Sequence, residues 1–428
     1  MNKVNRNKQP EILTPTAGAI PIPDICTLKG GVPVYLFGTG TLDLLRIEFV
    51  FNAGQLVEKS NLAATTANAM LTEGTTLHDA GTINDLIDMT GAALTHNADK
   101  DTACLIAVTL SRKLEEVMAL AEEVLFHPSF PEREFRMLMD KRIQSFLTNR
   151  QKTSVIAREE FYRALFGNNN PYGRVTVLED YNLMTKEIAQ SFHSEFYRRS
   201  NMYITVAGKD PEKAVPVLER YFSCNDPETW NRPVIPELDF ETAMPGRYFT
   251  EVHASVQSAI RMGWKGITRD HTDFMGLQVA NMVLGGYFGS RLMKNIREDK
   301  GYTYGISSVA SALHKTGFIT IMTEVANDYR EQTIEEIKKE INDLSDFEIS
   351  QQELMLVRNH IMGEIARMFD GPFTTAETIR GLIDYNTDLD YYRQLEETVK
   401  TITAGKIREL FKTYYDTDKA IEIIAGAK

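Results

Sequence analysis

"VLGGYFGSRLMKNIREDKGYTYGI", residues 283–306, is the stretch of this 428-residue sequence that decides the fold. It contains a cluster of glycines: Gly285, Gly286 and Gly289. Glycine permits positive φ angles and close approach of the backbone, so one tight turn does not account for all three. We expect a helix to begin at Ser290 and to end near Gly301, which can adopt the left-handed conformation that closes many helices. A strand, "YTYGISSVAS", should follow.

A glycine-rich loop before a helix can bind a phosphate group at the helix N-terminus. "GGYFGS" lacks the Lys-Ser/Thr pair of a P-loop, and it does not have the spacing of the dinucleotide-binding fingerprint. Nucleotide binding is therefore not the interpretation that we favour.

The chain contains matching blocks at a separation that drifts from about 212 to 220 positions. The pairs are "LLRIEFVFNAG" (44–54) with "QSAIRMGWKG" (257–266), the helical region 113–143 with 332–361, and "NMYITVAGK" (201–209) with "AIEIIAGAK" (420–428). Several matched blocks in the same order are hard to obtain by chance. We interpret them as a tandem duplication.

Two further signals concern helices of the second half. Ser350 can cap a helix, and Glu353 three residues later completes a capping-box pattern. "RMFDGPFTTAETI" (367–379) should interrupt a long helix at Gly371-Pro372 and then resume it. A plain helix-turn-helix is favoured there over a hinge or lid.

The segment "SCNDPETWNRPVIPELDFETAMPG" (223–246) separates the halves. Its prolines disfavour a helix or central strand: Pro227, Pro233, Pro236 and Pro245. We predict an N-terminal domain over 1–222, an extended linker over 223–246 and a C-terminal domain over 247–428. Each half mixes strands and helices without strict alternation, which predicts the α+β class with mostly antiparallel sheets covered by helices. The natural ligand site is then the cleft across which the two domains face each other.

Composition excludes several classes of protein. The net charge of -12 and the dispersed basic residues argue against nucleic-acid binding. No apolar run approaches the length of a membrane span. The first residues, "MNKVNRNKQPEILTP", have no apolar signal region, so we expect a cytoplasmic protein, with the periplasm as the alternative. Three distant cysteines, Cys26, Cys104 and Cys224, are interpreted as isolated thiols.

A second informative stretch is "LAATTANAMLTEGT" (62–75), a short helix-like run that ends in Gly-Thr. Its polar face carries Thr65 and Asn68 next to Ala69. These are mild side chains for a helix in a chain of enzyme size.

The motif Gly-Gly-x-x-x-Ser-Arg-Leu, followed by Arg-Glu-x-x-Gly-x-x-Tyr, resembles the second-domain signature of the insulinase/pitrilysin-type zinc metallopeptidases, the inverted zincins. The subunits of mitochondrial processing peptidase and the bc1-complex core proteins belong to the same group. The resemblance extends from about residue 25 to the C-terminus and implies two duplicated domains of the LuxS/metallohydrolase-like fold. It also implies that Arg297 and Tyr304 reach across the cleft and bind substrate near the metal.

A guanidinium and a phenol can both donate to a peptide carbonyl or a developing oxyanion, so this implied role is chemically reasonable. Without the resemblance, Arg297 would be a solvated cation near a helix end and Tyr304 a sheet residue. The resemblance makes the substrate-binding pair the favoured interpretation.

Active members of this family carry His-x-x-Glu-His before a Gly-Thr ending, with zinc on the two histidines and a glutamate that activates water. Aligning that ending with Gly74-Thr75 places Thr65, Asn68 and Ala69 at the His, Glu and second His positions. Threonine and asparagine are poor zinc ligands and alanine is none. The chain therefore has a degenerate metal motif, and we expect it to bind no zinc.

A relocated metal site has little support in the sequence. No two histidines lie three or four residues apart: His78, His96, His127, His193, His253, His271, His314 and His360. The family's third ligand should come from the helix near 132–147, where the acidic candidates are Glu132, Glu134 and Asp140. None of the three can be assigned to the ligand position.

The resemblance leaves two functions open. In the first, the chain is the non-catalytic subunit of a two-chain zinc metalloendopeptidase and supplies Arg297 and Tyr304 in trans to a His-x-x-Glu-His partner. Zinc would then lie in that partner of a heterodimer that cleaves peptides or unfolded segments. In the second, the chain is a catalytically inert peptide-binding or scaffold protein of the same fold. A peptidase with unorthodox ligands is the weakest alternative.

Overall fold

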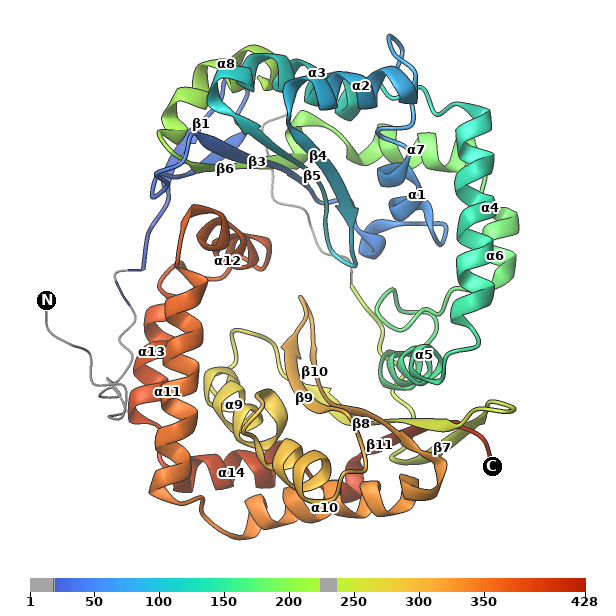
Figure 1. Cartoon of the computed structure of the whole chain (residues 1–428), viewed down its shortest axis with the longest axis vertical. Coiled ribbons are helices and arrows are strands. Elements are labelled where there is room, and N and C mark those ends of the chain that lie inside the picture. The colour runs from blue at the N-terminus through green and yellow to red at the C-terminus, as the bar shows by residue number, and fades with distance from the viewer. Residues whose placement is uncertain (1–17, 19, 224–236) are drawn as a thin grey trace, which may run out of the picture.

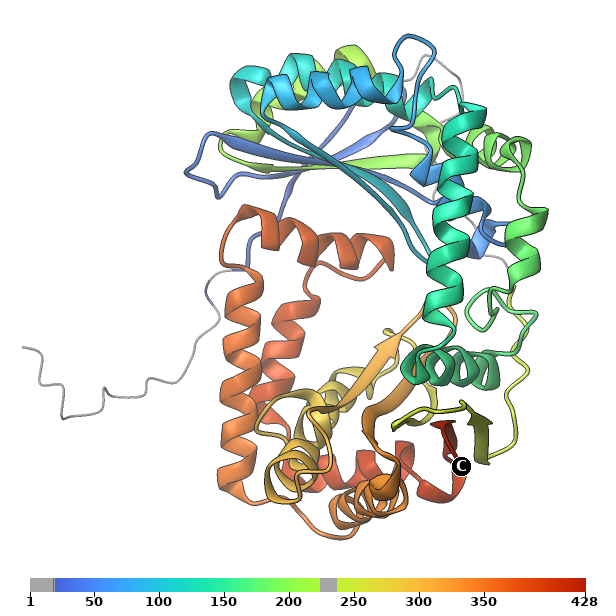
Figure 2. The same cartoon turned by 45° about the vertical axis from the view of Figure 1, so that its right-hand side comes forward.

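Two β-sheets, one from each half of the chain, form the framework of the protein (Figure 1). The computed structural model describes residues 18, 20–223 and 237–428. The two sheets face each other, with most helices on their outer faces (Figure 2). The predicted α+β class with two helix-covered sheets is confirmed.

The first sheet has six strands in the order β1-β2-β6-β3-β5-β4. They are β1 (Asp24–Thr27), β2 (Pro33–Phe37), β3 (Leu44–Phe51), β4 (Ala93–Ala98), β5 (Ala103–Leu110) and β6 (Met202–Gly208). β2 and β6 are parallel, and all other neighbours are antiparallel. On the central strand, Phe49 lies opposite Leu105 and Ile204. All three side chains are fully buried, so the first core is centred on β3.

The second sheet has five strands in the order β7-β11-β8-β10-β9. They are β7 (Gly246–Glu251), β8 (Gln257–Gly266), β9 (Ile306–Ala312), β10 (Gly317–Ala326) and β11 (Ile421–Gly426). The order β2-β6-β3-β5-β4 of the first sheet is thus repeated, including a single parallel pair, here β7 with β11. Strand order and direction both agree with a tandem duplication.

The helices also repeat in order. The first half has α1 (Ala63–Ala69), α2 (Ala80–Thr90), α3 (Leu114–Phe126), α4 (Glu132–Asn149), α5 (Thr153–Phe166), α6 (Leu178–Leu183), α7 (Lys186–Phe196) and α8 (Val215–Phe222). The second half has α9 (Phe274–Asn281), α10 (Arg330–Asp346), α11 (Gln351–Met368), α12 (Pro372–Asp384), α13 (Tyr391–Thr401) and α14 (Ala404–Tyr414). Within the described ranges, no helix is long and apolar enough to cross a lipid bilayer.

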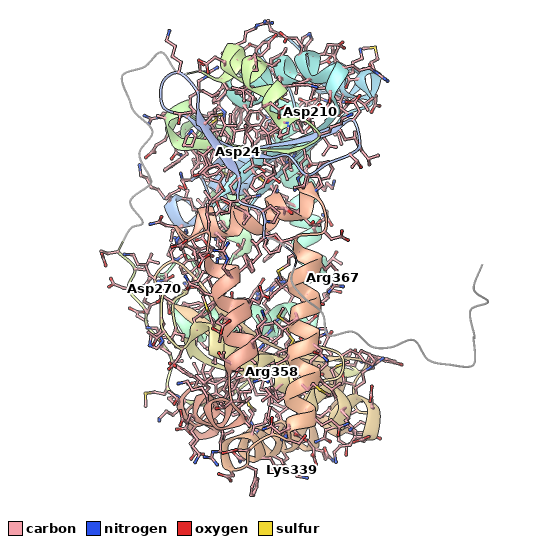
Figure 3. All side chains as sticks on the ribbon, turned by 90° about the vertical axis from the view of Figure 1, so that its left-hand side faces the viewer. Asp24, Asp210, Asp270, Lys339, Arg358 and Arg367 are labelled. Atoms are coloured by element: carbon pink, nitrogen blue, oxygen red, sulfur yellow. The ribbon has the colours of Figure 1, made fainter. Side chains whose placement is uncertain are left out.

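The halves exchange one helix each. α5 of the first half packs on β8 and β11, and α12 of the second half packs on β6 and β2. α12 can reach the opposite sheet because the helix breaks between Met368 and Pro372, at the Gly-Pro pair that the sequence indicated. α11 and α13 run side by side below α12 (Figure 3).

A buried ionic network joins α12 to the first sheet. Arg380 on α12 forms ion pairs with Glu48 on β3, at 3.0 Å, and with Asp384, at 3.4 Å. Glu48 is fully buried and also pairs with Arg46, at 2.7 Å. The Tyr203 hydroxyl donates a hydrogen bond to Asp384. The exchanged helix is therefore fixed by charge as well as by apolar packing.

The predicted linker lies only partly within the described residues. Positions 224–236, with Pro227, Pro233, Pro236 and Cys224, fall outside them, as do 1–17 and 19. Beyond this gap, the Thr242 hydroxyl and the Ala243 amide donate hydrogen bonds to carbonyls of α5. This end of the linker is therefore bound to the exchanged helix. The exact domain limits stay a prediction, and Cys26 and Cys104 are free thiols.

Candidate functional site

α1 carries the degenerate metal motif. Thr65 and Ala69 lie one turn apart and are half-buried, so they share a face, whereas Asn68 is buried. The Thr65 hydroxyl donates to the Leu62 carbonyl at 3.2 Å, a local bond within the first turn of the helix. The face expected from the alignment is thus present, without metal-binding side chains.

Asn68 forms a structural hydrogen-bond network. Its Nδ2 donates to the Tyr197 hydroxyl, at 3.0 Å, and to the Cys104 carbonyl, at 3.3 Å. Its Oδ1 lies 3.1 Å from Nδ1 of His96 on β4. Because a buried amide must satisfy its donors and acceptor, these contacts account for an asparagine at this position.

The second half uses the same device at the equivalent place. Asn281 at the end of α9 donates to the Ser308 carbonyl at 2.9 Å, and it accepts from the Tyr415 hydroxyl at 3.2 Å. Tyr415 follows α14 as Tyr197 follows α7, so the Asn–Tyr pair recurs across the duplication. Asn68 therefore occupies the position at which family peptidases carry a catalytic glutamate. Its contact with a tyrosine is the one that Asn281 makes in the second half.

Arg142 on α4 reaches the motif face. Its guanidinium donates to the Thr66 hydroxyl at 2.8 Å, to the Thr65 carbonyl at 2.9 Å and to the Thr65 hydroxyl at 3.5 Å. It forms no ion pair with a described residue, and burial lowers its pKa, although a guanidinium keeps its charge in proteins. Burial, followed by the charge of Arg142, also lowers the pKa of His96.

These residues do not fit a zinc ion. Zinc sites need three or four lone-pair donors, and the motif face offers a hydroxyl and a methyl group beside a cation. Among residues 18, 20–223 and 237–428, no group of three or more His, Cys, Asp or Glu side chains could hold a metal ion. The acidic candidates on α4 do not supply one: Glu132 pairs with Arg136 and Lys186, and Asp140 is exposed.

The glycine cluster begins in a short π-helical segment, η5 (Met282–Gly286), which contains Gly285 and Gly286. Gly289 lies in the loop between η5 and a second π-helical segment, η6 (Met293–Asp299). π-helical turns are rare and often occur at functional sites. None of the three glycines has a positive φ, and at Gly285 close packing against the backbone accounts for the glycine. A Cβ atom on Gly285 would lie 2.7 Å from the backbone nitrogen of Ser308 on β9.

The helix after the loop differs from the prediction in two ways. It begins after Ser290, which is buried, and most of it is π-helical. Its start is fixed by Arg291, whose guanidinium donates to both carboxylate oxygens of Glu353, at 2.7 and 2.9 Å. Gly301 has the expected left-handed conformation, with φ of 67°.

Arg297 lies on η6 and is half-buried. Its guanidinium carbon is 4.5 Å from the ring centroid of Phe288, a cation–π contact. It has no ion pair with another described residue. The guanidinium is thus held in place by a ring, and its hydrogen-bond donors remain available.

Tyr304 lies in the loop before β9, which begins at Ile306 rather than at Tyr302 as predicted. Its side chain is 94% exposed. The loop is held by Thr303, whose hydroxyl donates to the Gly305 and Glu324 carbonyls at 2.9 and 2.8 Å. Tyr304 is therefore presented to solvent on an ordered loop and is not a sheet residue.

Tyr304 and Phe288, the ring that contacts Arg297, line different cavities. Tyr304 lines a cavity of about 330 Å³ together with Arg261, Glu324 and Ser154 at the start of α5. Phe288, whose ring contacts the Arg297 guanidinium, lines a separate cavity of about 530 Å³ between α9 and α11. Sequence reasoning missed both Phe288 and Arg142, and a lone arginine on an amphipathic helix gives no signal of a role.

A family model described as "Peptidase M16 inactive domain" matches residues 184–360, which include η5, the loop, Arg297 and Tyr304. Over these residues the chain is similar to the M16 peptidase family. The insulinase/pitrilysin resemblance and the interpretation as a member lacking the zinc motif are thereby confirmed. An "Uncharacterized zinc protease" of Rickettsia felis is 22% identical over 80% of this chain and 82% of its own length. YmxG of Bacillus subtilis, also called an uncharacterized zinc protease, is 22% identical over 79% and 82%.

Two solved structures share the fold over 95% of this chain. A peptidase M16 inactive domain from Pseudomonas fluorescens superposes with a TM-score of 0.84 at 22% identity, covering 95% of this chain and 98% of that one. A protease from Helicobacter pylori gives a TM-score of 0.84 at 15% identity, covering 95% and 100%. At such identities the agreement concerns the fold.

Proposed function

We propose that this chain is the non-catalytic subunit of a two-chain zinc metalloendopeptidase in the cytoplasm. A homologous partner with His-x-x-Glu-His would bind the zinc and cleave peptides or unfolded segments. This chain would bind no metal and would supply Arg297 and Tyr304 to the substrate in trans.

The observation that carries the proposal is the contrast between the two halves. The face of α1 has lost its ligands and faces the Arg142 guanidinium. The second half keeps an arginine without an ion pair among described residues and a tyrosine that is 94% exposed. A solvent-exposed tyrosine on an ordered loop contributes little to the fold, so a role toward another molecule explains it better.

The two side chains suit an extended peptide chemically. The guanidinium of Arg297 and the phenol of Tyr304 are hydrogen-bond donors, and a peptide carbonyl or a developing oxyanion is an acceptor. Phe288 restricts the guanidinium through its ring contact, which reduces the entropy lost on binding. Their contribution is to bind and orient, while the bond-breaking chemistry belongs to the partner.

The test is reconstitution with the homologous subunit, followed by a peptide-cleavage assay. We expect the lone chain to be inactive and Arg297→Ala in the complex to lower the rate on the order of 10²–10³-fold, typical of losing an oxyanion donor. Tyr304→Phe should also reduce it. Lys294→Ala on the same segment and Tyr329→Phe, another exposed tyrosine, are the matched controls. Cleavage by the lone chain would refute the proposal.

One observation favours the alternative of an inert peptide-binding or scaffold protein. Tyr304 lines one cavity, whereas Phe288, the ring that contacts Arg297, lines another, so the two side chains do not line one shared cavity. Full activity of both variants in the complex would select this alternative.

A further inference from the structure

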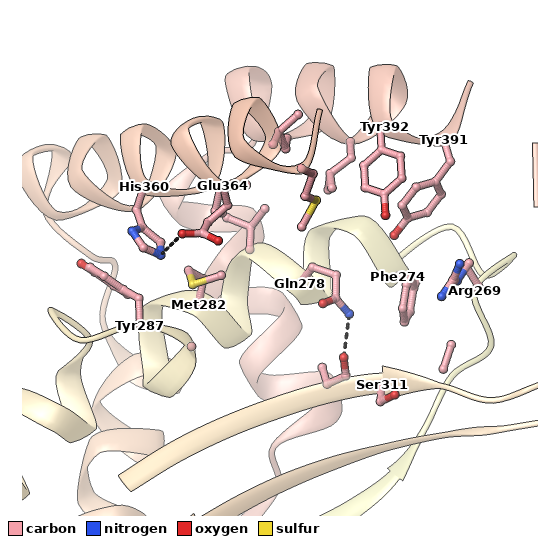
Figure 4. A pocket seen from close by; sticks show the side chains of 18 of the residues that line it. Arg269, Phe274, Gln278, Met282, Tyr287, Ser311, His360, Glu364, Tyr391 and Tyr392 are labelled. Atoms are coloured by element: carbon pink, nitrogen blue, oxygen red, sulfur yellow. Dashed lines mark hydrogen bonds and ion pairs between the residues drawn. The ribbon is translucent and has the colours of Figure 1, made fainter. Parts of the chain in front are cut away.

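The cavity of about 530 Å³ lies between α9, η5, β9, α11 and α13 (Figure 4). In the duplication these elements correspond to α1, β4, α4 and α6 of the first half. In the first half the equivalent space holds Arg142, Asn68 and His96. Arg142 donates a hydrogen bond to Thr66 on α1, and Asn68 on α1 is hydrogen-bonded to His96 on β4. The second half keeps this space open.

Most of the cavity wall is apolar. Phe274, Met282, Ile365, Met368 and Leu395 contribute hydrocarbon and thioether surface. The volume lies in the range of small-molecule sites, which are about 300–1,000 Å³. A ligand here would need an apolar body.

One end of the cavity presents hydrogen-bond donors without acceptors. Tyr391 is 8% exposed, and its hydroxyl has no hydrogen bond with a described residue. The Tyr392 hydroxyl likewise has none, and both point into the cavity (Figure 4). A tyrosine hydroxyl without a partner within the fold is free to donate a hydrogen bond to a ligand in the cavity.

Arg269 lies at the same end. Its guanidinium carbon is 4.6 Å from the ring centroid of Tyr385 and 5.6 Å from that of Tyr391. One nitrogen donates to the Gly381 carbonyl at 2.9 Å, and no carboxylate of the described residues pairs with it. A cation beside two phenol donors is a binding environment for an anion.

The polar groups elsewhere in the cavity are already satisfied. Glu364 forms an ion pair with Arg367 and lies 3.8 Å from His360. Gln278 donates to the Ala310 carbonyl at 2.9 Å. Glu364 and Gln278 are therefore already engaged within the fold, and the arginine without a carboxylate partner among the described lining residues lies at the Arg269 end.

We propose that this cavity binds a small monocarboxylic acid with an apolar body, its carboxylate directed to Arg269, Tyr391 and Tyr392. The apolar body lies between α9 and α11, against Met282 and Leu395. The proposal does not depend on the peptide-binding role of Arg297 and Tyr304, although Phe288, whose ring contacts Arg297, also lines this cavity.

The test is calorimetric titration of the full chain with decanoate, with 1-decanol as the probe that lacks the carboxylate. We expect decanoate to bind and decanol to bind at least tenfold more weakly. Tyr391→Phe combined with Tyr392→Phe removes the donors and keeps the volume, and it should weaken decanoate at least tenfold. Arg269→Gln should do the same. Arg393→Gln on α13, whose side chain is 64% exposed, is the control and should bind as the wild type does.

Three results would overturn the proposal. Decanoate could fail to bind, decanol could bind equally well, or the double tyrosine variant could keep its affinity. A third arm uses a short peptide that ends in leucine, with its C-terminal amide as control. Binding of the free peptide acid without binding of decanoate would identify a chain terminus as the ligand instead, and would also refute the proposal.

Discussion

Arg142 on α4 donates a 2.8 Å hydrogen bond to the hydroxyl of Thr66, on the helix that carries the degenerate metal motif. The same guanidinium donates to the Thr65 carbonyl at 2.9 Å, so a cation links these two helices. The motif face therefore differs from a zinc site by an added contact as well as by its missing ligands.

This relationship predicts how a metal site could be restored. Thr65→His with Ala69→His should bind no stoichiometric zinc while Arg142 is present, because the guanidinium and the zinc ion are both positive. Two like unit charges 4 Å apart near a protein surface repel by roughly 4 kcal/mol. Adding Arg142→Glu removes the cation and supplies a third ligand, and one zinc per chain is then expected. Zinc is measured by atomic absorption after gel filtration.

The control for that experiment is Arg133→Glu in the double-histidine background. Arg133 is an exposed arginine of the same helix, so it matches the charge change at a distance from α1. Zinc in the double variant, or none after Arg142→Glu, would show that the guanidinium is not what excludes the metal.

The close packing of η5 on β9 predicts opposite effects for two glycine substitutions. Gly285→Ala should destabilise the protein by about 1–3 kcal/mol, because its Cβ would lie 2.7 Å from Ser308 atoms. Gly363→Ala on α11 meets nothing within 4 Å and should stabilise by up to about 1 kcal/mol through helix propensity. Urea unfolding measures both, and equal effects would contradict the packing argument.

The exchanged helix α12 should depend on its ionic anchor. Arg380→Met leaves the fully buried Glu48 with Arg46 alone, so we expect a loss of about 3 kcal/mol in the free energy of unfolding. Arg393→Met, on the exposed side of α13, should change it by less than about 0.5 kcal/mol. A similar small effect for Arg380→Met would mean that apolar packing alone positions α12.

Glu58 gives the stability a pH dependence. Its side chain is 7% exposed, and this burial raises its pKa to about 7. The hydrogen bond from the Ala64 amide acts in the opposite direction, but its effect on the pKa is smaller. Between the unfolded pKa near 4.3 and about 7, the folded state therefore binds more protons than the unfolded state. The free energy of unfolding should fall as pH rises through this window.

Glu58→Gln should remove that part of the slope and, near pH 7, stabilise the protein relative to wild type by as much as about 3 kcal/mol. Denaturation at pH 4.5, 6 and 7.5 provides the measurement. Glu195→Gln, an exposed carboxylate that pairs with Lys59, is the control and should leave the slope unchanged. A wild-type slope in Glu58→Gln would exclude Glu58 as the source.

Several local features could be predicted from the sequence because short-range chemistry decides them. Ser350 caps α11 by accepting from the Glu353 amide at 3.1 Å, and the helix breaks at Gly371-Pro372. These positions depend on side-chain oxygens and on proline geometry, which neighbouring residues cannot override. The strand that starts at Ile306 rather than Tyr302 shows the limit, since Thr303 bonds there to the distant Glu324 carbonyl.

The sequence by itself determined the duplicated α+β fold and the absence of zinc ligands on α1. Hydrophobic periodicity predicts the fold. The absence of zinc ligands follows from side-chain identity, since threonine is a poor zinc ligand and alanine is none in any fold. Only the tertiary structure decided that Arg142 contacts Thr66, that α5 and α12 exchange sheets, and that Phe288 and Tyr304 line different cavities. Each of these joins residues far apart in the chain, whose meeting is set by how whole elements pack and not by any local pattern.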